Sequence, residues 1–322
     1  MSIAKRFLKI LFLLSPLLSC SVDTRVEEES FPFHSQDEND EEDSTTTSGK
    51  LETSSTSTDT SESSIGEYKF DVGSENPTSC RKIDFLFVID NSGSMSDNQE
   101  NLISNYQGFI DNIVGLTGYD DFHIGVITTD AYQYNGLNCS VMGGLVVKTG
   151  GSNSSASIDG ILSCGPWNEG NFMTKNEIDQ IDGFSCAAKV GTDGSPSETP
   201  IDAFIANLGP FLGSENQCNN GFHRDDAKLI VVFITDEDDS SNVSIFNAIQ
   251  QTEFFKGKLE NIAMIGLVPF PESECSSSFG TKMKDFILSF PYSVIGDICD
   301  EDYSVFLEEA IDTIDQVCRP VG

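Results

Sequence analysis

Five apolar runs separated by polar stretches dominate the chain after residue 80. Runs composed almost wholly of apolar residues are typical of strands that are buried on both faces of a sheet. Each run is short enough for a strand and too short for an ordinary helix. The predicted strands are residues 83–89, 122–127, 229–234, 262–268 and 292–295.

Between these runs, apolar residues recur at helical spacing. One such set extends from Leu102 to Val114 and another from Phe306 to Val317. Steps of three or four residues place these side chains on one face of a helix. Strands that alternate with helices predict an α/β fold, with a doubly wound, mostly parallel central sheet flanked by helices. We expect residues 79–322 to form one domain of this class.

The segment from about 131 to 190 departs from this pattern. It is rich in Gly, Ser and Asn, contains three cysteines, and has one weak strand signal at residues 145–148. We therefore expect a disulfide-rich insertion beside the functional edge of the sheet.

The chain begins with a short basic stretch followed by an apolar stretch, which is the pattern of an export signal. The apolar part is too short to span a membrane. The sequence from Leu17 to Cys20 resembles the bacterial lipobox, in which the cysteine receives lipid and becomes the first residue. This implies a lipoprotein signal peptide over residues 1–19 and an acyl anchor such as palmitate on Cys20, attaching the protein to the membrane through lipid only. The alternative is an ordinary signal peptide that is cut nearby.

Residues 20–78 are acidic, rich in Ser and Thr, and almost free of aliphatic residues. Such a segment cannot bury enough apolar surface to offset its ordering entropy, so we expect a disordered linker. A random coil of this length has an end-to-end distance of roughly 40 Å, which would hold a folded domain away from the lipid headgroups.

The formal net charge of −34 excludes nucleic acid as a partner, because phosphate binding needs a basic surface. An even set of eight cysteines follows Cys20, and in an exported chain this predicts disulfides. Zinc is the alternative, but the cysteines lack the spacing of zinc ligands. We expect Cys80 to pair with Cys318, across the two ends of the domain, and Cys275 to pair with Cys299.

Polar side chains follow two of the predicted strands. Asp90, Ser92 and Ser94 come at every second position after residues 83–89, and Asp236 comes shortly after residues 229–234. Ligands of open α/β sheets gather at the carboxyl ends of the strands, so we expect these groups to meet at one edge. Their oxygens suit a hard divalent cation such as Mg²⁺. The alternative is a simple turn in which Ser94 caps the next helix.

The motif DNSGS at residues 90–94, followed by FITDE at residues 233–237, resembles the von Willebrand factor type A domain, including the inserted domains of integrins. The resemblance covers roughly residues 80–320. It implies a metal-ion-dependent adhesion site with Asp90, Ser92 and Ser94 in the first loop and Asp236 in the third loop. The implied cation is Mg²⁺, with Ca²⁺ or Mn²⁺ as alternatives.

The resemblance also implies a ligand from a second loop, which here reads SETPIDAF. Thr199 is the expected ligand, because sites of this family use a threonine hydroxyl. Aligning the following helix by its apolar phase places Glu198 there instead, and coordination by Glu198 would make the site more anionic and favour calcium.

In this family such a site serves binding, since a partner's carboxylate completes the shell of the ion. No nucleophile, zinc-protease or phosphate-loop motif is present, so we expect no enzyme. The leading hypothesis is a lipid-anchored adhesin or receptor, similar to gliding-motility adhesin lipoproteins, which binds a protein or surface ligand. Its expected location is the bacterial outer membrane, with exposure at the cell surface as one orientation. The alternative is an envelope assembly or scaffold factor, and the sequence leaves the oligomeric state open.

Three further features are assigned structural roles. The acidic run continues with Asp238 and Asp239, for which we favour a solvated loop over a second cation site. Arg224 is expected to form a salt bridge with Asp225, Asp226 or the insertion. His123 alternates within a predicted strand and is expected to serve packing.

Overall fold

The computed structural model describes residues 80–115, 121–136, 138–157, 160–177, 180–271, 273, 275 and 279–319. The predicted signal peptide, Cys20 and the predicted linker lie outside these residues. Within the described ranges, no helix has the length and apolarity needed to cross a membrane.

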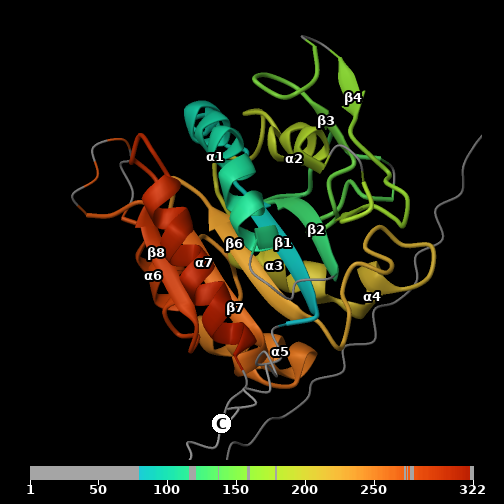
Figure 1. The fold of residues 1–322 in the computed structure, drawn as a ribbon. Helices are drawn as coiled ribbons and strands as arrows, with labels where there is room; N and C mark the ends of the chain where they lie inside the picture. The colour runs from blue at the N-terminus through green and yellow to red at the C-terminus, as the bar shows by residue number, and fades with distance from the viewer. Residues whose placement is uncertain are drawn as a thin grey trace, which may run out of the picture. The chain divides into compact units, whose positions relative to one another are not determined.

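A six-stranded sheet forms the centre of the described domain, with the strand order β5-β2-β1-β6-β7-β8 (Figure 1). All neighbouring strands are parallel except β2 and β5. The five predicted strands are present with ends shifted by no more than two residues, and the fold class is confirmed. The strands of this sheet are β1 (Lys82–Ile89), β2 (Asp121–Thr128), β5 (Met173–Thr174), β6 (Lys228–Ile234), β7 (Ile262–Val268) and β8 (Ser293–Asp297).

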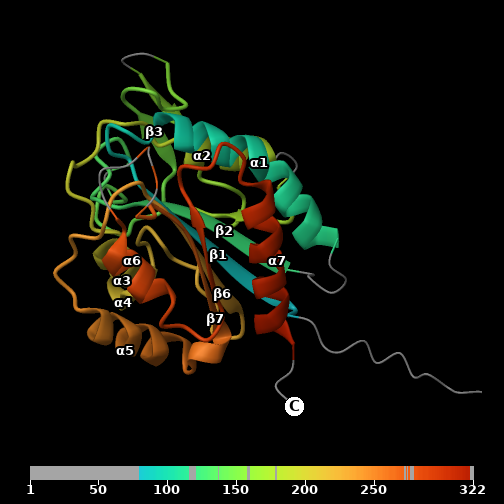
Figure 2. The same ribbon diagram turned by 90° about the vertical axis from the view of Figure 1, so that its left-hand side faces the viewer.

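Helices cover both faces of the sheet, as Figure 2 shows. One face carries α1 (Ser96–Gly115), α2 (Gln180–Ala188) and α7 (Ser304–Cys318). The opposite face carries α3 (Pro200–Leu208), α4 (Pro210–Gly213), α5 (Ile245–Lys256) and α6 (Thr281–Ile287). A 3₁₀ turn at Leu259–Asn261 leads into β7.

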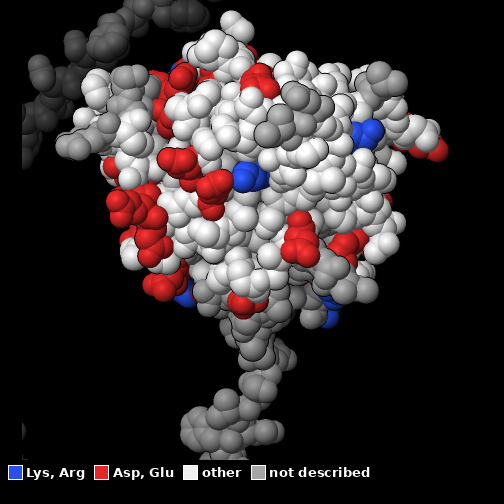
Figure 3. All heavy atoms as spheres, turned by 90° about the horizontal axis from the view of Figure 1, so that it is seen from above, with Lys and Arg blue, Asp and Glu red and all other residues white. Residues whose placement is uncertain are grey.

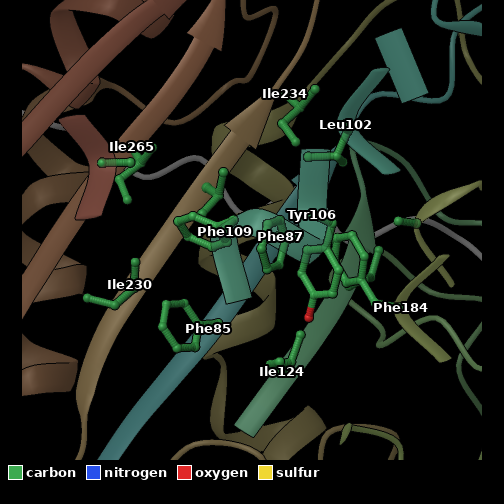
Figure 4. Close-up of a cluster of buried hydrophobic side chains, with 14 of the residues drawn as sticks. Phe85, Phe87, Leu102, Tyr106, Phe109, Ile124, Phe184, Ile230, Ile234 and Ile265 are labelled. Atoms are coloured by element: carbon green, nitrogen blue, oxygen red, sulfur yellow. The ribbon is translucent and has the colours of Figure 1, made fainter. Parts of the chain in front are cut away.

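The core consists of two apolar clusters, one on each face of the sheet. Under α1 and α2, the rings of Tyr106 and Phe184 stack with their centroids 3.5 Å apart (Figure 4). On the other face, the ring centroids of Phe204 and Phe233 lie 5.8 Å apart. Because β1, β6 and β7 contribute side chains to both clusters, their sequences are continuous apolar runs in which polar and apolar residues do not alternate.

The segment 131–190 forms a separate two-stranded sheet of β3 (Lys148–Gly150) and β4 (Ile161–Ser163), and it also supplies β5 and α2. The strand predicted at 145–148 is therefore wrong except for Lys148. The backbone N–H of Leu145 donates to the side chain of Asn219 (3.0 Å), and the N–H of Val147 donates to the side chain of Asn135 (3.1 Å). These N–H groups donate to side chains and are not available to β4, so β3 does not begin before Lys148.

Four disulfides join all eight cysteines of the described domain. The predicted pairs Cys80–Cys318 and Cys275–Cys299 are confirmed. Two more bridges hold the insertion, one within it and one tying it to the segment after α4. Disulfides at this density indicate an extracytoplasmic, oxidising compartment. The remaining bridges are Cys164–Cys186 and Cys139–Cys218.

A buried ion pair lies at the edge where the strands begin. The Arg224 guanidinium contacts the Asp84 carboxylate (Nε to Oδ1, 2.8 Å) and the Asp121 carboxylate (Nη1 to Oδ1, 2.7 Å). The predicted salt bridge of Arg224 is therefore present, but its partners are not Asp225, Asp226 or the insertion. The segment before β6 turns the arginine toward the start of β1.

His123 is buried in β2, where it packs against Phe172 with ring centroids 4.2 Å apart. Its Nδ1 lies 2.8 Å from the carbonyl oxygen of Phe222. The packing role predicted for this histidine is confirmed.

His223 is expected to make the folded domain sensitive to acid. Its Nε2 lies 2.7 Å from the Asn207 side-chain oxygen, while its Nδ1 is buried and has no hydrogen-bond partner among the described residues. Protonation would therefore leave an unsatisfied N–H, and burial together with the charge of Lys256 lowers the pKa of His223 to about 3.

We expect a loss of stability when the pH falls, because an unfolded histidine takes up a proton near pH 6.5 and the folded one does not until about pH 3. Protonation of His223 does not lower the free energy of unfolding above pH 6.5. By pH 5 it lowers the free energy of unfolding by about 2 kcal/mol. Urea unfolding of wild type and His223→Gln at pH 7.5 and pH 5 measures it. An equal change in both proteins would contradict this role of His223.

Candidate metal centre

The first loop is fixed against the third loop by hydrogen bonds to Asp90. The backbone N–H of Asp90 donates to the carbonyl of Ile234 in β6 (2.9 Å). Its buried carboxylate accepts from the backbone N–H of Ser92 (2.7 Å) and from the hydroxyl of Thr235 (2.7 Å). In addition, Gln99 of α1 donates to the carbonyl of Asp90 (3.0 Å). The chain thus holds the Asp90 carboxylate in one position at the carboxyl edge of the sheet.

The hydroxyls of the first loop lie together beside the third loop. The oxygens Oγ of Ser92 and Ser94 are 3.4 Å apart. The Ser94 hydroxyl also forms a hydrogen bond to the Asp236 carboxylate, which is almost fully buried. Asp90 and Asp236 are 146 positions apart in the sequence. The four residues predicted from the first and third loops nevertheless meet at one edge of the sheet.

The second loop presents Glu198 and Thr199 in different directions. The Thr199 hydroxyl donates to the backbone carbonyl of Thr129 (2.8 Å), and Thr199 stands at the N-cap of α3. Glu198 is fully buried, and its Oε2 accepts a hydrogen bond from the Thr129 hydroxyl. Its Oε1 is also buried and has no hydrogen-bond partner among the residues that the structure describes.

Three carboxyl groups share this buried region. Burial, with a contribution from the charge of Asp236, raises the pKa of Asp90. Burial, with a contribution from the charge of Asp90, raises the pKa of Glu198, and burial raises the pKa of Asp236. No salt bridge found among the described residues involves Asp90 or Glu198. Buried carboxylates without a basic partner are costly, and a divalent cation would compensate them.

The available donors fit a hard cation, since all are carboxylate or hydroxyl oxygens. Among the described residues, no group of three or more His, Cys, Asp or Glu side chains has the arrangement of a metal cluster. A site built partly from hydroxyls does not depend on such a cluster. Sequence reasoning missed Thr129 and Thr235, whose hydroxyls orient the carboxylates. Their position in the sequence could have indicated this role, because Thr129 directly follows β2 and Thr235 directly follows β6.

The prediction of a solvated loop at Asp238 and Asp239 is wrong, because both carboxylates accept hydrogen bonds from the starts of neighbouring helices. Asp238 accepts hydrogen bonds from the backbone N–H groups of Lys282 (2.8 Å) and Met283 (3.2 Å), at the start of α6. Asp239 is buried, accepts from the backbone N–H of Ile201 in α3 (3.1 Å) and pairs with the Lys282 ammonium (2.7 Å). The acidic run therefore joins the third loop to the N-terminal ends of α3 and α6.

Replacing Asp239 with asparagine is expected to destabilise the domain by about 3 kcal/mol, because it removes a charged acceptor of several hydrogen bonds and leaves Lys282 uncompensated. It also loosens the start of α3, which carries the second loop, so cation affinity should fall as well. Chemical denaturation and calorimetry measure the two effects. The control is Asp315→Asn in the exposed pair with Arg319, which should change stability by less than about 0.5 kcal/mol. Equal effects of the two substitutions would contradict the anchoring role.

A groove of about 770 Å³ begins at Ser94 and Asp236 and runs along α1 toward the loop after β8. Figure 3 looks down on this edge, where acidic side chains gather along one side and basic ones are sparse. The groove therefore gives an outside molecule access to the site through a negatively charged channel. Besides the two site residues, its charged lining consists of Asp97, Glu100, Asp300 and Glu301.

No family model matches the chain, and no curated protein matches it. Solved structures of proximal thread matrix protein 1 (PTMP1) from the mussel byssus match it with 13–14% identity and TM-scores of 0.40–0.41. The match covers 74% of this chain and 48–49% of PTMP1, so this chain spans about half the length of those structures. One of them is described as having a zinc-occupied MIDAS motif.

Proposed function

We propose that the domain binds a divalent cation, Mg²⁺, Ca²⁺ or Mn²⁺, at the carboxyl edge of its sheet and holds a ligand of another molecule through that ion. Asp90, Ser92, Ser94 and Asp236 would hold the ion, together with a second-loop oxygen from Thr199 or Glu198. The resemblance of the first and third loops to those of type A domains supports this assignment.

The observation that carries the proposal is the buried Asp90 carboxylate. It is fixed by donors from two loops, and the charges of Asp236 and Glu198 act on the same buried region. No salt bridge found among the described residues gives it a basic partner. A protein rarely buries several carboxylates without compensation, and metal coordination is a common reason for such an arrangement.

The roles of the chain's own groups follow from their contacts. Thr235 and the backbone N–H of Ser92 hold Asp90 in place, and Thr129 holds Glu198. When bound, the cation supplies positive charge at the entrance of the acidic groove, where it attracts an oxygen of the partner. This is a binding function, which accords with the lack of catalytic motifs in the sequence.

We propose further that Cys20 carries lipid and that the protein is anchored in the bacterial outer membrane as an adhesin or receptor for a protein or surface ligand. The export signal, the lipobox resemblance and the four disulfides of the domain support this location. The resemblance to type A domains implies that a carboxylate of the partner binds the ion. The second candidate is an envelope scaffold that uses the same site from the periplasmic side.

Partner capture tests the binding role. The full chain is purified in mild detergent, immobilised and exposed to envelope and cell-surface extracts. Wild type is tested with Ca²⁺ or Mg²⁺ and with chelator, and the Asp90→Asn variant is tested with the same metals. We expect a specific ligand to be retained only by wild type with metal. Retention of the same ligand under all conditions would contradict a metal-dependent function.

Protease treatment of intact cells distinguishes the two candidates. An outward-facing adhesin should be degraded by the added protease, whereas a periplasmic scaffold should survive until the outer membrane is opened.

A further inference from the structure

An apolar groove lies between α5 and the junction of α3 with α4, on the face of the sheet opposite α7. It has a volume of about 470 Å³, and its apolar walls include Leu208, Pro210, Phe254 and Phe255. Among the described residues that line it, none is charged. Phe254 is 91% exposed, and exposed apolar surface beside a groove is typical of a binding surface.

The rim of the groove is polar. The side-chain amides of Asn247 and Gln250 line it on the side of α5 and can form hydrogen bonds with the backbone of an extended segment. Glu253 is exposed on the same helix. The groove therefore suits an extended peptide that carries aromatic side chains and a positive charge.

The groove lies close to the point where the chain enters the domain. The Lys256 ammonium at the end of α5 donates to the carbonyl of Arg224 (2.8 Å), and the backbone N–H of Arg224 donates to the Asp84 carboxylate (2.8 Å). Asp84 follows Cys80 by four residues, which is about 13 Å of extended chain. The last turn of α5, which carries Phe254, is therefore within reach of a segment shortly before Cys80.

The sequence before Cys80, which lies outside the described residues, contains one segment of suitable chemistry. Residues 65–72 read IGEYKFDV, in which Tyr68 and Phe70 flank Lys69. Nine residues separate Phe70 from Cys80, and an extended chain of that length spans roughly 33 Å. The segment is therefore long enough to reach the groove.

We propose that residues 68–70 dock in the groove of their own domain, with Tyr68 and Phe70 against its apolar walls and Lys69 beside Glu253. The short connection to Cys80 keeps the segment at an effective concentration of about 1 mM or more at the groove, so modest affinity is sufficient. The inference does not depend on the proposed metal site.

A second aromatic pair, Phe31 and Phe33, suits the groove less well. Forty-six residues separate Phe33 from Cys80, and closing this longer loop costs more entropy. Acidic residues flank the pair on both sides, and Glu253 would repel them. Phe33 therefore provides a matched control for Phe70.

Docking gives the domain a defined orientation. α5 ends near the edge where the strands begin, whereas the candidate metal site lies at the edge where they end (Figure 1). If Cys20 carries lipid, as proposed above, the docked segment turns the first edge toward the membrane and the second edge away from it.

Photo-cross-linking of the full chain in mild detergent tests the docking. Benzoylphenylalanine replaces Phe70, and the cross-linked peptides are mapped by mass spectrometry. We expect cross-links to α4 and α5 of the same chain, with a yield that Phe254→Lys reduces at least about 5-fold. The same probe in place of Phe33 should give no preferred cross-link to the groove. Val305→Lys, at an exposed position of α7 on the opposite face, should leave the yield unchanged.

Two further measurements separate loss of docking from loss of the fold. Circular dichroism checks that Phe254→Lys is folded. Lys69→Glu, which lies before the domain, should also lower the yield, because it places a second negative charge beside Glu253.

Equal cross-linking from the two probe positions, or a yield that Phe254→Lys leaves unchanged, would overturn the proposal. Cross-links that join two chains would overturn it by identifying a second copy as the occupant, and cross-links to detergent alone would assign the groove to lipid. The assay contains no divalent metal, so its failure leaves the proposed function untouched.

Discussion

Replacing Asp90 with asparagine is expected to remove divalent-cation binding, with a loss in affinity of at least about 100-fold. Asp90 is the carboxylate on which both loops converge, so the amide removes charge at the centre of the site. The fold should remain, because the Thr235 hydroxyl also lies 3.2 Å from the Glu237 carbonyl and can donate there while accepting from the new amide. Calorimetry measures the affinity, and circular dichroism checks the fold.

The same substitution should raise the melting temperature of the metal-free protein. Burial raises the pKa of Asp90, which means that the charged form is disfavoured in the folded state when no cation compensates it. A neutral amide avoids this cost. Wild type should gain thermal stability when Ca²⁺ is added, and the variant should not. A metal-free variant that melts well below wild type, or a variant that still gains stability from Ca²⁺, would contradict this account of the site.

Removal of the Cys80–Cys318 bridge is expected to lower the free energy of unfolding by about 4 kcal/mol. This disulfide joins the start of β1 to the end of α7 across 238 residues, so it restricts the unfolded chain more than any other bridge here. It also ties α7 to the central strand of the sheet. Guanidinium unfolding of the double variant Cys80→Ser, Cys318→Ser measures the loss.

The Cys275–Cys299 bridge provides the matched comparison, because it closes only 24 residues. Its removal should cost about 3 kcal/mol at most, clearly less than removal of Cys80–Cys318, since the entropy of loop closure grows with the length of the loop. A larger effect from the short loop would show that native-state contacts, rather than the restriction of the unfolded chain, decide these stabilities.

The strands and the convergence of Asp90 and Asp236 were predictable because both depend on local patterns. A strand buried on both faces appears in the sequence as an apolar run, and parallel strands bring their carboxyl ends to one edge. The fold class followed from the alternation of strands and helices. The disulfides Cys80–Cys318 and Cys275–Cys299 were also predicted, the first because its cysteines flank the domain.

The features that sequence reasoning missed depend on contacts between distant segments. Glu198 and Thr199 are neighbours, so the direction of each side chain is decided by Thr129, about 70 positions earlier, and by the loop that follows β6. Arg224 pairs with Asp84, which is 140 positions away. Asp239 resembles a solvated acid in the sequence, yet it is buried because α3 and Lys282 supply donors.

Anomalous diffraction from a crystal soaked in Mn²⁺ tests the central claim most directly. The proposed site predicts a strong anomalous peak enclosed by Asp90, Ser92, Ser94 and Asp236, with Glu198 on the side of the second loop, and predicts its disappearance in Asp90→Asn. A crystal in which manganese scatters elsewhere, while the space between these residues stays empty at saturating metal, would contradict it.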